Sequence, residues 1–267
     1  MTQDHQSSPL GGAASAAPLE GKVAVVTGSG AGGIGAATAL RLAGAGADVV
    51  LNDRVEGTTG GTEQAIRDLG REAVGVVANV LRPEGASAVM DAALTRWGRL
   101  DILVNVVGGM KFGDIRIWDL PEDAWDFTIA LNLKSTFLCT KAALPHMMEK
   151  RSGRIVNFSS TAAVGMPEHA HYATAKAGIV AFTRSCAAQL APYDVTVNAV
   201  SPGPTLTESV LKAGFLRADS DWSDEVPLGR PNEPDDVAQA VLFLASDAGR
   251  NITGVNLAVA GGLPYLG

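Results

Sequence analysis

Short apolar runs that alternate with longer segments of helical period are the feature that most constrains the fold of this chain. Residues 22–27 (KVAVVT) form a β-branched run, residues 34–45 are rich in alanine and leucine at helical spacing, and residues 48–51 (DVVL) form a second apolar run. The runs are apolar throughout, which is typical of strands buried on both faces of a sheet. Strand–helix–strand repeats with right-handed crossovers predict a parallel sheet with helices on both sides.

The same alternation continues to the end of the sequence. Further strands are expected at residues 73–77, 102–106, 154–158, 195–200 and 255–259, and further helices at 63–69, 84–97, roughly 121–149, 170–190 and 235–244. No change of composition and no long linker divides the two halves. We therefore predict an α/β fold: one doubly wound, Rossmann-type domain over residues 19–267, with a parallel sheet of about seven strands.

Charge narrows the classes of function. The 267 residues include 21 Lys and Arg against 28 Asp and Glu, a formal net charge of −7. Binding to nucleic acid and anchoring at a membrane surface both need basic patches, so we expect neither partner. No run reaches the roughly 18 apolar residues that a membrane-spanning helix needs. Residues 1–18 are small and polar, unlike a secretory signal, and predict a flexible N-terminal tail.

The two cysteines, Cys139 and Cys186, both fall within apolar helical patterns. One pair offers neither a disulfide framework nor the spacing of a zinc site, so we expect buried, reduced thiols. Together with the missing signal and membrane span, the cysteines predict a soluble cytoplasmic protein.

A glycine-rich loop, residues 27–35 (TGSGAGGIG), follows the first expected strand and opens the next helix. Glycines let a phosphate approach the backbone, and the helix N-terminus presents free N–H donors. Asp53 ends the second strand, 18 residues past Gly35, where its carboxylate can accept hydrogen bonds from the ribose hydroxyls of adenosine. Either feature alone fits a structural turn, but the two together indicate a dinucleotide site.

Tyr172 and Lys176 stand at positions i and i+4, which places a phenol and an ammonium on one face of a helix. Lowering the pKa of a tyrosine from about 10 to about 7 requires roughly 4 kcal/mol. A cation about 4 Å away contributes on the order of 4 kcal/mol at an effective dielectric constant of 20. One lysine therefore suffices, in principle, to make the tyrosine an acid or base near neutral pH.

The order of these motifs resembles that of the short-chain dehydrogenases/reductases over roughly residues 19–262. After the glycine loop and Asp53 come Asn105-Val-Val-Gly108, Asn132, Ser159-Ser160, Tyr172-xxx-Lys176 and Pro202-Gly203. The C-terminal motifs Leu-Gly-Arg-Pro, Pro-Asp-Asp-Val and a final Gly-Gly are similar to the ~250-residue branch of that family. Each motif is loose alone, but their joint order is specific.

This resemblance implies an oxidoreductase that transfers a hydride between NAD(H) and a secondary alcohol or ketone. Tyr172 would exchange a proton with the substrate oxygen, a serine would polarise that oxygen, and Lys176 would lower the phenol pKa and hold the nicotinamide ribose. Asn132 would fix a water that links Lys176 to solvent. The implied cofactor contacts are Gly28, Gly33, Ile34, Gly35, Asp53, Asn79, Val80, Asn105, Gly108, Tyr172, Lys176, Pro202, Gly203, Thr205 and Thr207. Family likeness also suggests a homotetramer that pairs its long helices, roughly 121–149 and 170–190, across subunits.

The sequence departs from the family pattern in ways that bear on the site. The glycine loop is one residue longer than usual, which leaves its path open between Gly30 and Gly33, and Asn79 stands where an aspartate often contacts adenine. The segment before Tyr172 is one residue short: counting back from the tyrosine selects Ser159, whereas aligning the strand selects Ser160. We favour Ser160, because a rigid strand must hold a catalytic hydroxyl while a loop absorbs deletions.

Asp53 predicts NAD over NADP, since a 2′-phosphate would meet a like charge, although the neighbouring Arg54 complicates this expectation. No Lys or Arg lies within residues 29–34, where phosphate-selective relatives often carry one.

Three functions remain open. The first is a dehydrogenase or reductase of small to medium, fairly apolar alcohols and ketones. The second is a reductase of 3-oxoacyl groups linked to a carrier or coenzyme A, which a basic patch from Lys111, Arg116 and Lys212 would favour. The third, a non-enzymatic cofactor-binding scaffold, fits poorly with intact serine, tyrosine, lysine and asparagine. His169 and His171 lack further ligands at metal spacing, so we expect no metal and assign them to the substrate pocket.

Overall fold

Seven parallel strands form one sheet in the order β3-β2-β1-β4-β5-β6-β7. The computed structural model describes residues 17–263 except 213, 215 and 217–220. The strands are β1 (Val23–Thr27), β2 (Asp48–Asp53), β3 (Ala73–Val77), β4 (Ile102–Asn105), β5 (Gly153–Phe158), β6 (Val195–Pro202) and β7 (Asn256–Val259). The predicted doubly wound α/β fold is confirmed, and each predicted strand is present within two residues at either end.

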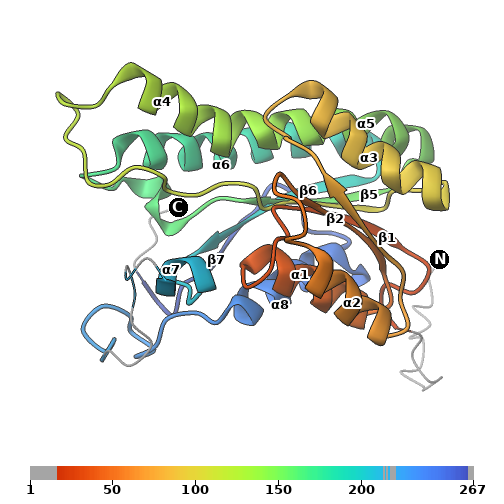
Figure 1. Ribbon diagram of the computed structural model, residues 1–267. Helices are drawn as coiled ribbons and strands as arrows, with labels where there is room; N and C mark the ends of the chain where they lie inside the picture. The colour runs from red at the N-terminus through yellow and green to blue at the C-terminus, as the bar shows by residue number, and fades with distance from the viewer. Residues whose placement is uncertain (1–16, 213, 215, 217–220, 264–267) are drawn as a thin grey trace, which may run out of the picture.

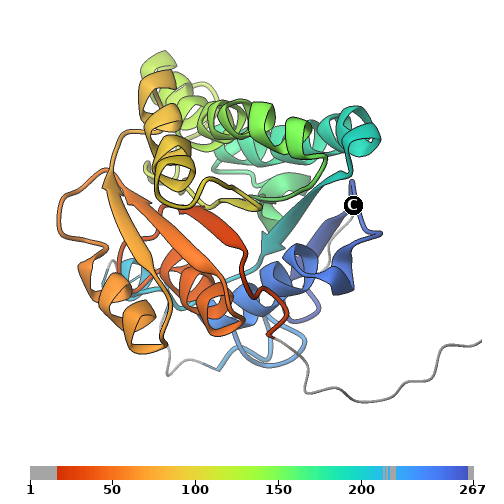
Figure 2. The same cartoon turned by 90° about the vertical axis from the view of Figure 1, so that its right-hand side faces the viewer.

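Helices cover both faces of this sheet (Figures 1 and 2). They are α1 (Ile34–Gly44), α2 (Gly60–Asp68), α3 (Pro83–Trp97), α4 (Glu122–Ile129), α5 (Ser135–Lys150), α6 (Ala170–Leu190), α7 (Glu208–Lys212) and α8 (Pro234–Ala245). Leu42 of α1 and Val241 of α8 belong to the apolar core on one face, and Met90 of α3 and Met147 of α5 belong to the core on the other. The helix α7 is not among the predicted elements.

The expectation that every strand is buried on both faces is wrong for the two edges of the sheet. The strands β1, β2, β4, β5 and β6 are almost wholly buried, but in β3 the residues alternate and Val77 is 59% exposed. The strand β7 is only half-buried. An edge strand has a neighbour on one side only, so an apolar run in it does not imply burial.

The helix predicted over roughly residues 121–149 is continuous but contains one turn of π-helix, Ala130–Lys134, between α4 and α5. Asn132 lies in that turn and is fully buried. A π-turn widens the helix locally and is frequent at functional sites. It presents the Asn132 amide toward the loop that follows β4.

The predicted tail, residues 1–18, lies outside the described residues apart from Ala17 and Pro18, which begin a turn closed by Glu20 N donating to Ala17 O at 2.9 Å. Leu19 is buried and joins the core. Both cysteines are free; Cys139 is buried as expected, and burial raises the pKa of its thiol to about 12, but Cys186 is only half-buried. Across the described helices, none combines the length and apolar character that crossing a membrane requires.

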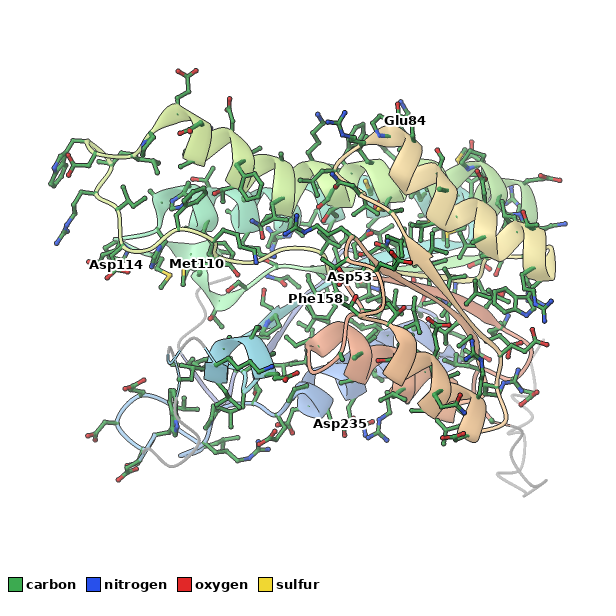
Figure 3. The ribbon with its side chains drawn as sticks, viewed as in Figure 1. Asp53, Glu84, Met110, Asp114, Phe158 and Asp235 are labelled. Atoms are coloured by element: carbon green, nitrogen blue, oxygen red, sulfur yellow. The ribbon has the colours of Figure 1, made fainter. Side chains whose placement is uncertain are left out.

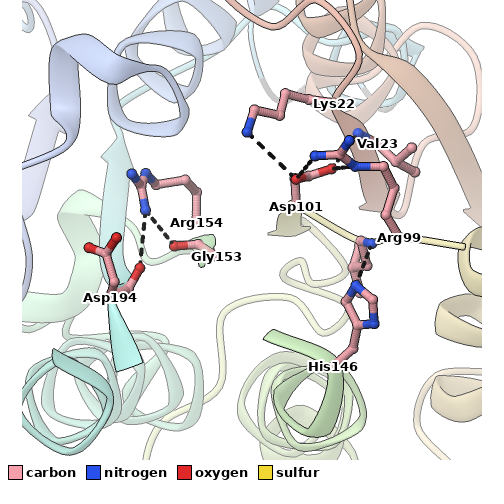
Figure 4. Close-up of polar contacts among 9 residues, drawn as sticks. Lys22, Val23, Arg99, Asp101, His146, Gly153, Arg154 and Asp194 are labelled. Carbon is pink, nitrogen blue, oxygen red and sulfur yellow. Dashed lines mark hydrogen bonds and ion pairs between the residues drawn. The ribbon is translucent and has the colours of Figure 1, made fainter. Parts of the chain in front are cut away.

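All seven strands run in one direction, so their carboxyl ends lie on one side of the sheet, where Asp53 ends β2 and Phe158 ends β5 (Figure 3). On the opposite side, at the amino ends of the strands, lies a cluster of polar contacts (Figure 4). The Asp101 carboxylate accepts hydrogen bonds from Val23 N at 2.9 Å and Arg99 Nε at 2.7 Å, and His146 Nε2 accepts one from Leu100 N at 3.1 Å. These bonds hold the chain just before β4 to the start of β1.

A row of buried amides and hydroxyls crosses the middle of the sheet. Asn105 and Asn157 are partners in the β4–β5 register, and Asn105 Nδ2 donates to Asn157 Oδ1 at 2.9 Å and to Thr140 Oγ1 of α5 at 3.2 Å. Asn157 Nδ2 in turn donates to Thr183 Oγ1 of α6 at 3.0 Å. The row therefore connects two strands to the two helices that cover them.

Candidate active site

The glycine loop packs closely between β1, β4 and α1. Gly28 has a φ of +64°, and a Cβ there would lie 3.1 Å from Val107 N, so this position requires glycine for its conformation and its space. Gly35, in the first turn of α1, lies against Gly28, where a Cβ would come within 2.8 Å of the Gly28 carbonyl carbon. Gly33 precedes α1 and Ile34 is its first residue. The unpaired N–H groups of α1 thus face the loop, as a phosphate site requires.

Asp53 lies beside the loop at the end of β2. A Cβ on Gly30 would come 2.7 Å from Asp53 Oδ2, so the glycine and the carboxylate are in direct contact, while Asp53 Oδ1 accepts a hydrogen bond from Val55 N at 3.0 Å. This settles the path that the sequence left open: Gly30 turns toward Asp53, and Gly32, at φ +73°, accepts a hydrogen bond from Glu208 N of α7 at 2.9 Å. The sequence pattern does not single out Gly30, because nothing distinguishes one glycine from another in such a loop.

Two buried residues that the sequence did not single out fix the adenosine side of the site. Ser29 Oγ accepts a hydrogen bond from Asn52 N at 2.9 Å, which ties the glycine loop to β2. Asn52 Nδ2 donates to Val76 O at 3.0 Å and to Ala78 O at 3.1 Å, which ties β2 to the end of β3. The predicted contacts Asn79 and Val80 follow there; Asn79 is exposed and Val80 is buried.

The two serines after β5 have different surroundings. The Ser159 hydroxyl is buried and donates to Lys176 O at 2.9 Å, so it joins the strand end to α6. The Ser160 side chain hydrogen-bonds the hydroxyl of Tyr172 and accepts a hydrogen bond from Ala162 N at 3.2 Å. Ser160 is thus the serine whose hydroxyl meets the tyrosine.

Tyr172, Lys176 and Asn132 gather at the same place. Lys176 Nζ lies 5.6 Å from the centroid of the Tyr172 ring and donates to Phe158 O at 2.8 Å. A Cβ on Gly108 would come 2.7 Å from Asn132 Oδ1 and 3.0 Å from Lys176 Nζ. The asparagine and the lysine therefore flank the loop after β4, and only a glycine at position 108 leaves both in place.

The expected fall in the pKa of Tyr172 is wrong for the protein alone. Burial raises the pKa of Tyr172 above its ordinary value, and the hydrogen bond from Ser160 acts in the opposite direction. Lys176 is itself buried, and the loss of hydration lowers its pKa to about 7. An amine that is only partly protonated near neutral pH exerts a weaker Coulomb effect on the phenol than a fully charged ammonium.

The remaining predicted contacts follow β6. Pro202 ends that strand, and Gly203 N donates to Val259 O of β7 at 2.9 Å. Thr205 and Thr207 are buried; Thr205 Oγ1 donates to Gly203 O at 2.9 Å, and Thr207 Oγ1 lies 3.1 Å from Ser209 Oγ. They lead directly into α7, which contacts the glycine loop through Glu208 and Gly32.

Asn105 is placed differently from its predicted role. Its side chain lies in the buried row that crosses the sheet, bonded to Asn157 and Thr140, and does not form part of the loop beside Lys176. Strand alternation sends the side chain of this residue into the layer of α5 and α6, a direction that the motif alone does not reveal. Within the described residues no group of three or more His, Cys, Asp or Glu side chains could hold a metal ion.

Comparisons with known proteins agree with this geometry. A family model described as enoyl-(acyl carrier protein) reductase matches residues 30–264. The chain is 42% identical to cis-4-hydroxycyclohexanecarboxylate dehydrogenase of Sinomonas cyclohexanicum over 90% of its length and 96% of the relative, and 41% identical to 3-oxoacyl-[acyl-carrier-protein] reductase FabG of Vibrio cholerae over 92% and 98%. Among solved structures, carveol dehydrogenase of Mycobacterium avium in complex with NAD is similar with a TM-score of 0.84 and 31% identity, covering 92% of this chain and 98% of that one. The chain belongs to the short-chain dehydrogenase/reductase family of oxidoreductases.

Proposed function

We propose that this protein is an NAD(H)-dependent dehydrogenase of secondary alcohols, which also reduces the corresponding ketones. The observation that carries the proposal is the convergence of Ser160, Tyr172 and Lys176 at the carboxyl ends of the strands, where one strand, β4, separates β5 from β1 and its glycine loop. An open parallel sheet binds ligands at this end of its strands, where the strand order reverses between β1 and β4.

The residues present fit a nicotinamide dinucleotide. At positions 28, 30 and 35 a side chain would collide with its neighbours, and glycine keeps the backbone accessible there. The start of α1 offers N–H donors to a pyrophosphate. Asp53 beside Gly30 would hold the adenosine ribose, and Lys176 would hold the second ribose. The bound cofactor would supply or accept the hydride.

Proton transfer falls to the chain's own side chains. Because burial raises the pKa of Tyr172, its neutral phenol predominates at pH 7 and can donate a proton to a ketone oxygen. Ser160, bonded to the same hydroxyl, would polarise the substrate oxygen. Lys176 lies next to the Tyr172 ring, and the pKa of its amine is about 7. The lysine can therefore replace a proton that the phenol has given up.

The charges around the site favour a small apolar substrate over a carrier-linked one. Of the three basic residues proposed to recognise a carrier, Lys212 forms an ion pair with Glu208, and Arg116 lies 3.9 Å from Glu168. The segments after β4 and β5 and the helix α7 instead expose the apolar side chains of Met110, Val164 and Leu211. Reduction of a 3-oxoacyl group on a carrier stays the second candidate, because the Vibrio cholerae relative is named for that activity.

We expect NAD rather than NADP. The Asp53 carboxylate next to Gly30 would repel a 2′-phosphate, and a kcat/KM at least ten times higher with NAD than with NADP is the expected result. The direct measurement is the absorbance of the reduced nicotinamide over a panel of cyclic and linear secondary alcohols with each cofactor. Equal values for the two cofactors would contradict this prediction.

The substitution Tyr172→Phe is expected to abolish turnover and to leave cofactor binding nearly intact. It removes the phenolic hydroxyl, and kcat should fall by about 10²–10⁴-fold, the usual loss of a general acid or base. Lys176→Ala should lose both turnover and cofactor affinity, because its ammonium would serve the ribose as well as the phenol. Rates come from steady-state kinetics and affinities from NADH fluorescence; a Tyr172→Phe variant that keeps more than about a tenth of kcat contradicts the proposal.

We further propose a cytoplasmic homotetramer. Two free thiols support a reducing compartment. On the outer side of α5 and α6, Phe137 is 42% exposed and contacts Phe182 edge to face, with ring centroids 6.4 Å apart. Such half-exposed aromatic pairs are typical of interfaces. Sedimentation equilibrium of the wild type tests the tetramer, and a monomer would refute it.

A further inference from the structure

Residues 109–116 run from the candidate active site to the start of α6, the helix that carries Tyr172 and Lys176. We call these residues the flap segment. Its first residue is held by Asn132, whose Oδ1 accepts a hydrogen bond from Gly109 N at 2.9 Å and whose Nδ2 donates to Gly109 O at 3.1 Å. Its beginning is therefore fixed beside Lys176, at the place where Gly108 contacts both side chains.

The far end of the flap segment is fastened to the residues that precede Tyr172. His169 Nε2 lies 3.0 Å from Asp114 Oδ1, and Ile115 N donates to Glu168 O at 3.0 Å. The Phe112 ring lies 6.1 Å from the His171 ring, centroid to centroid. Figure 3 shows Met110 and Asp114 on the same side of the sheet, with Asp114 the farther of the two from Phe158 at the end of β5.

Among the described parts of the chain, the one polar contact of the His169 ring is with Asp114. The side chain of His169 is 4% exposed, whereas that of Asp114 is 80% exposed. The Nε2 atom faces the Asp114 carboxylate, which leaves Nδ1 as the other polar atom of the ring. Nδ1 is buried and finds no hydrogen-bond partner among the residues that the structure describes. A buried imidazole with one of its two nitrogen atoms unpaired lowers the stability of the fold. Packing alone therefore does not explain why a histidine occupies this position.

The position of His169 relates this contact to catalysis. His169 is the residue directly before α6 and stands three residues before Tyr172. The flap segment thus spans from Asn132 to His169, and its Phe112 ring lies against His171, the residue before the tyrosine. Its inner residues, Met110 to Gly113, include two of the exposed side chains of this edge.

We propose that His169 is a positioning residue for the substrate: by binding Asp114 it fastens the flap segment beside Tyr172, where the segment forms one wall of the substrate site. This rests on the function proposed above. The fastened wall sets the affinity for the alcohol or ketone, and the proton transfer at Tyr172 and the cofactor contacts at the glycine loop do not depend on it.

Two substitutions break the contact from opposite sides. His169→Phe keeps a ring of similar size, and Asp114→Ala removes a mostly exposed carboxylate and so leaves the fold intact. Each is expected to raise the KM for the substrate by about tenfold, because each removes the polar contact that holds the flap segment, with kcat and the NADH dissociation constant within about twofold. The double variant should be no worse than either single one, because both remove the same contact.

The conservative variant Asp114→Asn should keep a KM near that of the wild type, because it keeps a polar oxygen at the position that faces Nε2. Asp119→Ala is the matched control: this exposed acid lies just beyond the flap segment, and its side chain makes none of the contacts described above. Equal falls in kcat and cofactor affinity, additive effects in the double variant, or an unchanged KM in Asp114→Ala would each overturn the proposal.

Hydrogen exchange separates this inference from the proposed function. Amides of the flap segment should exchange at least about tenfold faster in Asp114→Ala than in the wild type or Asp119→Ala, whatever the protein's substrate. If the wild type oxidises no alcohol and reduces no ketone, the proposed function fails while the exchange result still reports on the contact. If the exchange is unchanged, the contact does not fasten the segment, and this inference fails with the activity intact.

Discussion

Ser159 and Ser160 are neighbours in sequence, but only one hydroxyl meets the tyrosine. Ser160 bonds Tyr172, whereas Ser159 is committed to the carbonyl of Lys176. Ser160→Ala should therefore lower kcat by roughly 10²-fold or more, the loss expected for one donor at a reacting oxygen. Ser159→Ala should lower kcat far less and cost about 1 kcal/mol of folding free energy, the net value of one buried hydrogen bond.

Steady-state kinetics and denaturation of both variants measure this difference. A larger loss of kcat in Ser159→Ala would show that the spacing to Tyr172, and not the strand, selects the working serine. NADH affinity serves as the control, since neither hydroxyl contacts the glycine loop.

The structure brings the predicted serine, tyrosine and lysine together because a strand and a helix fix where those side chains lie; their roles in catalysis stay a prediction. Sequence reasoning failed where the environment decides. The direction of Asn105 depends on which face of β4 packs on helices, and the pKa of Tyr172 depends on how much water burial removes. The contact between Gly30 and Asp53 depends on a loop path that glycines do not encode.

Among the elements, α1 and the glycine loop that follows β1 approach each other so closely that no side chain fits between them at Gly35. A Cβ on Gly35 would meet the backbone of Gly28 and Ser29, at 2.8 Å and 2.9 Å, and backbone cannot move aside as a flexible side chain can. Gly35→Ala should therefore displace the start of α1, weaken NADH binding by at least about tenfold and cost about 1–3 kcal/mol of stability, as overpacking does.

Gly44→Ala is the matched control on the same helix. A Cβ at Gly44 meets nothing within 4 Å, so alanine should stabilise α1 by up to about 1 kcal/mol and leave cofactor binding unchanged. Fluorescence titration with NADH and thermal unfolding test both variants. If Gly35→Ala bound NADH like the wild type, the close approach of α1 and the glycine loop would not determine the affinity for the cofactor.

Hydrophobic period predicted the helices and strands well because most of them are long and face a core. The π-turn around Asn132 escaped it, since five residues of wider helix barely disturb the period of a helix of this length. The helix α7 has five residues and buries none of them, so it carries no periodic signal at all. Short elements at the edge of the site are where sequence patterns are weakest.

For the molecule as a whole, the buried Lys176 makes folding depend on pH. Its pKa is about 7 in the folded chain against an ordinary 10.5, so between these values the unfolded chain binds a proton that the folded chain does not. The free energy of unfolding should therefore decrease as the pH falls from about 10.5 to 7, by on the order of a few kcal/mol, and change no further below that range on account of this group.

Lys176→Met should remove this dependence and unfold at a higher denaturant concentration than the wild type at pH 7, although it is inactive. The lost bond to Phe158 O subtracts part of the gain. Urea unfolding of the protein without cofactor at pH 7 and pH 9.5 tests the prediction, with Lys150→Met, an exposed lysine, as the control. A variant less stable than the wild type at pH 7 would contradict it.

The buried row of Asn105, Asn157, Thr140 and Thr183 has a consequence for how reliably the chain finds its fold. Before their asparagines, β4 (Leu103-Val104) and β5 (Ile155-Val156) are both apolar, so apolar packing alone distinguishes poorly between the two strands as paired and the same strands shifted by one residue. A one-residue shift of either strand would turn its amide to the opposite face and would break the hydrogen bond between the two amides. The two amides thus specify the register of β4 and β5, and they disfavour misaligned sheets that a wholly apolar core would tolerate.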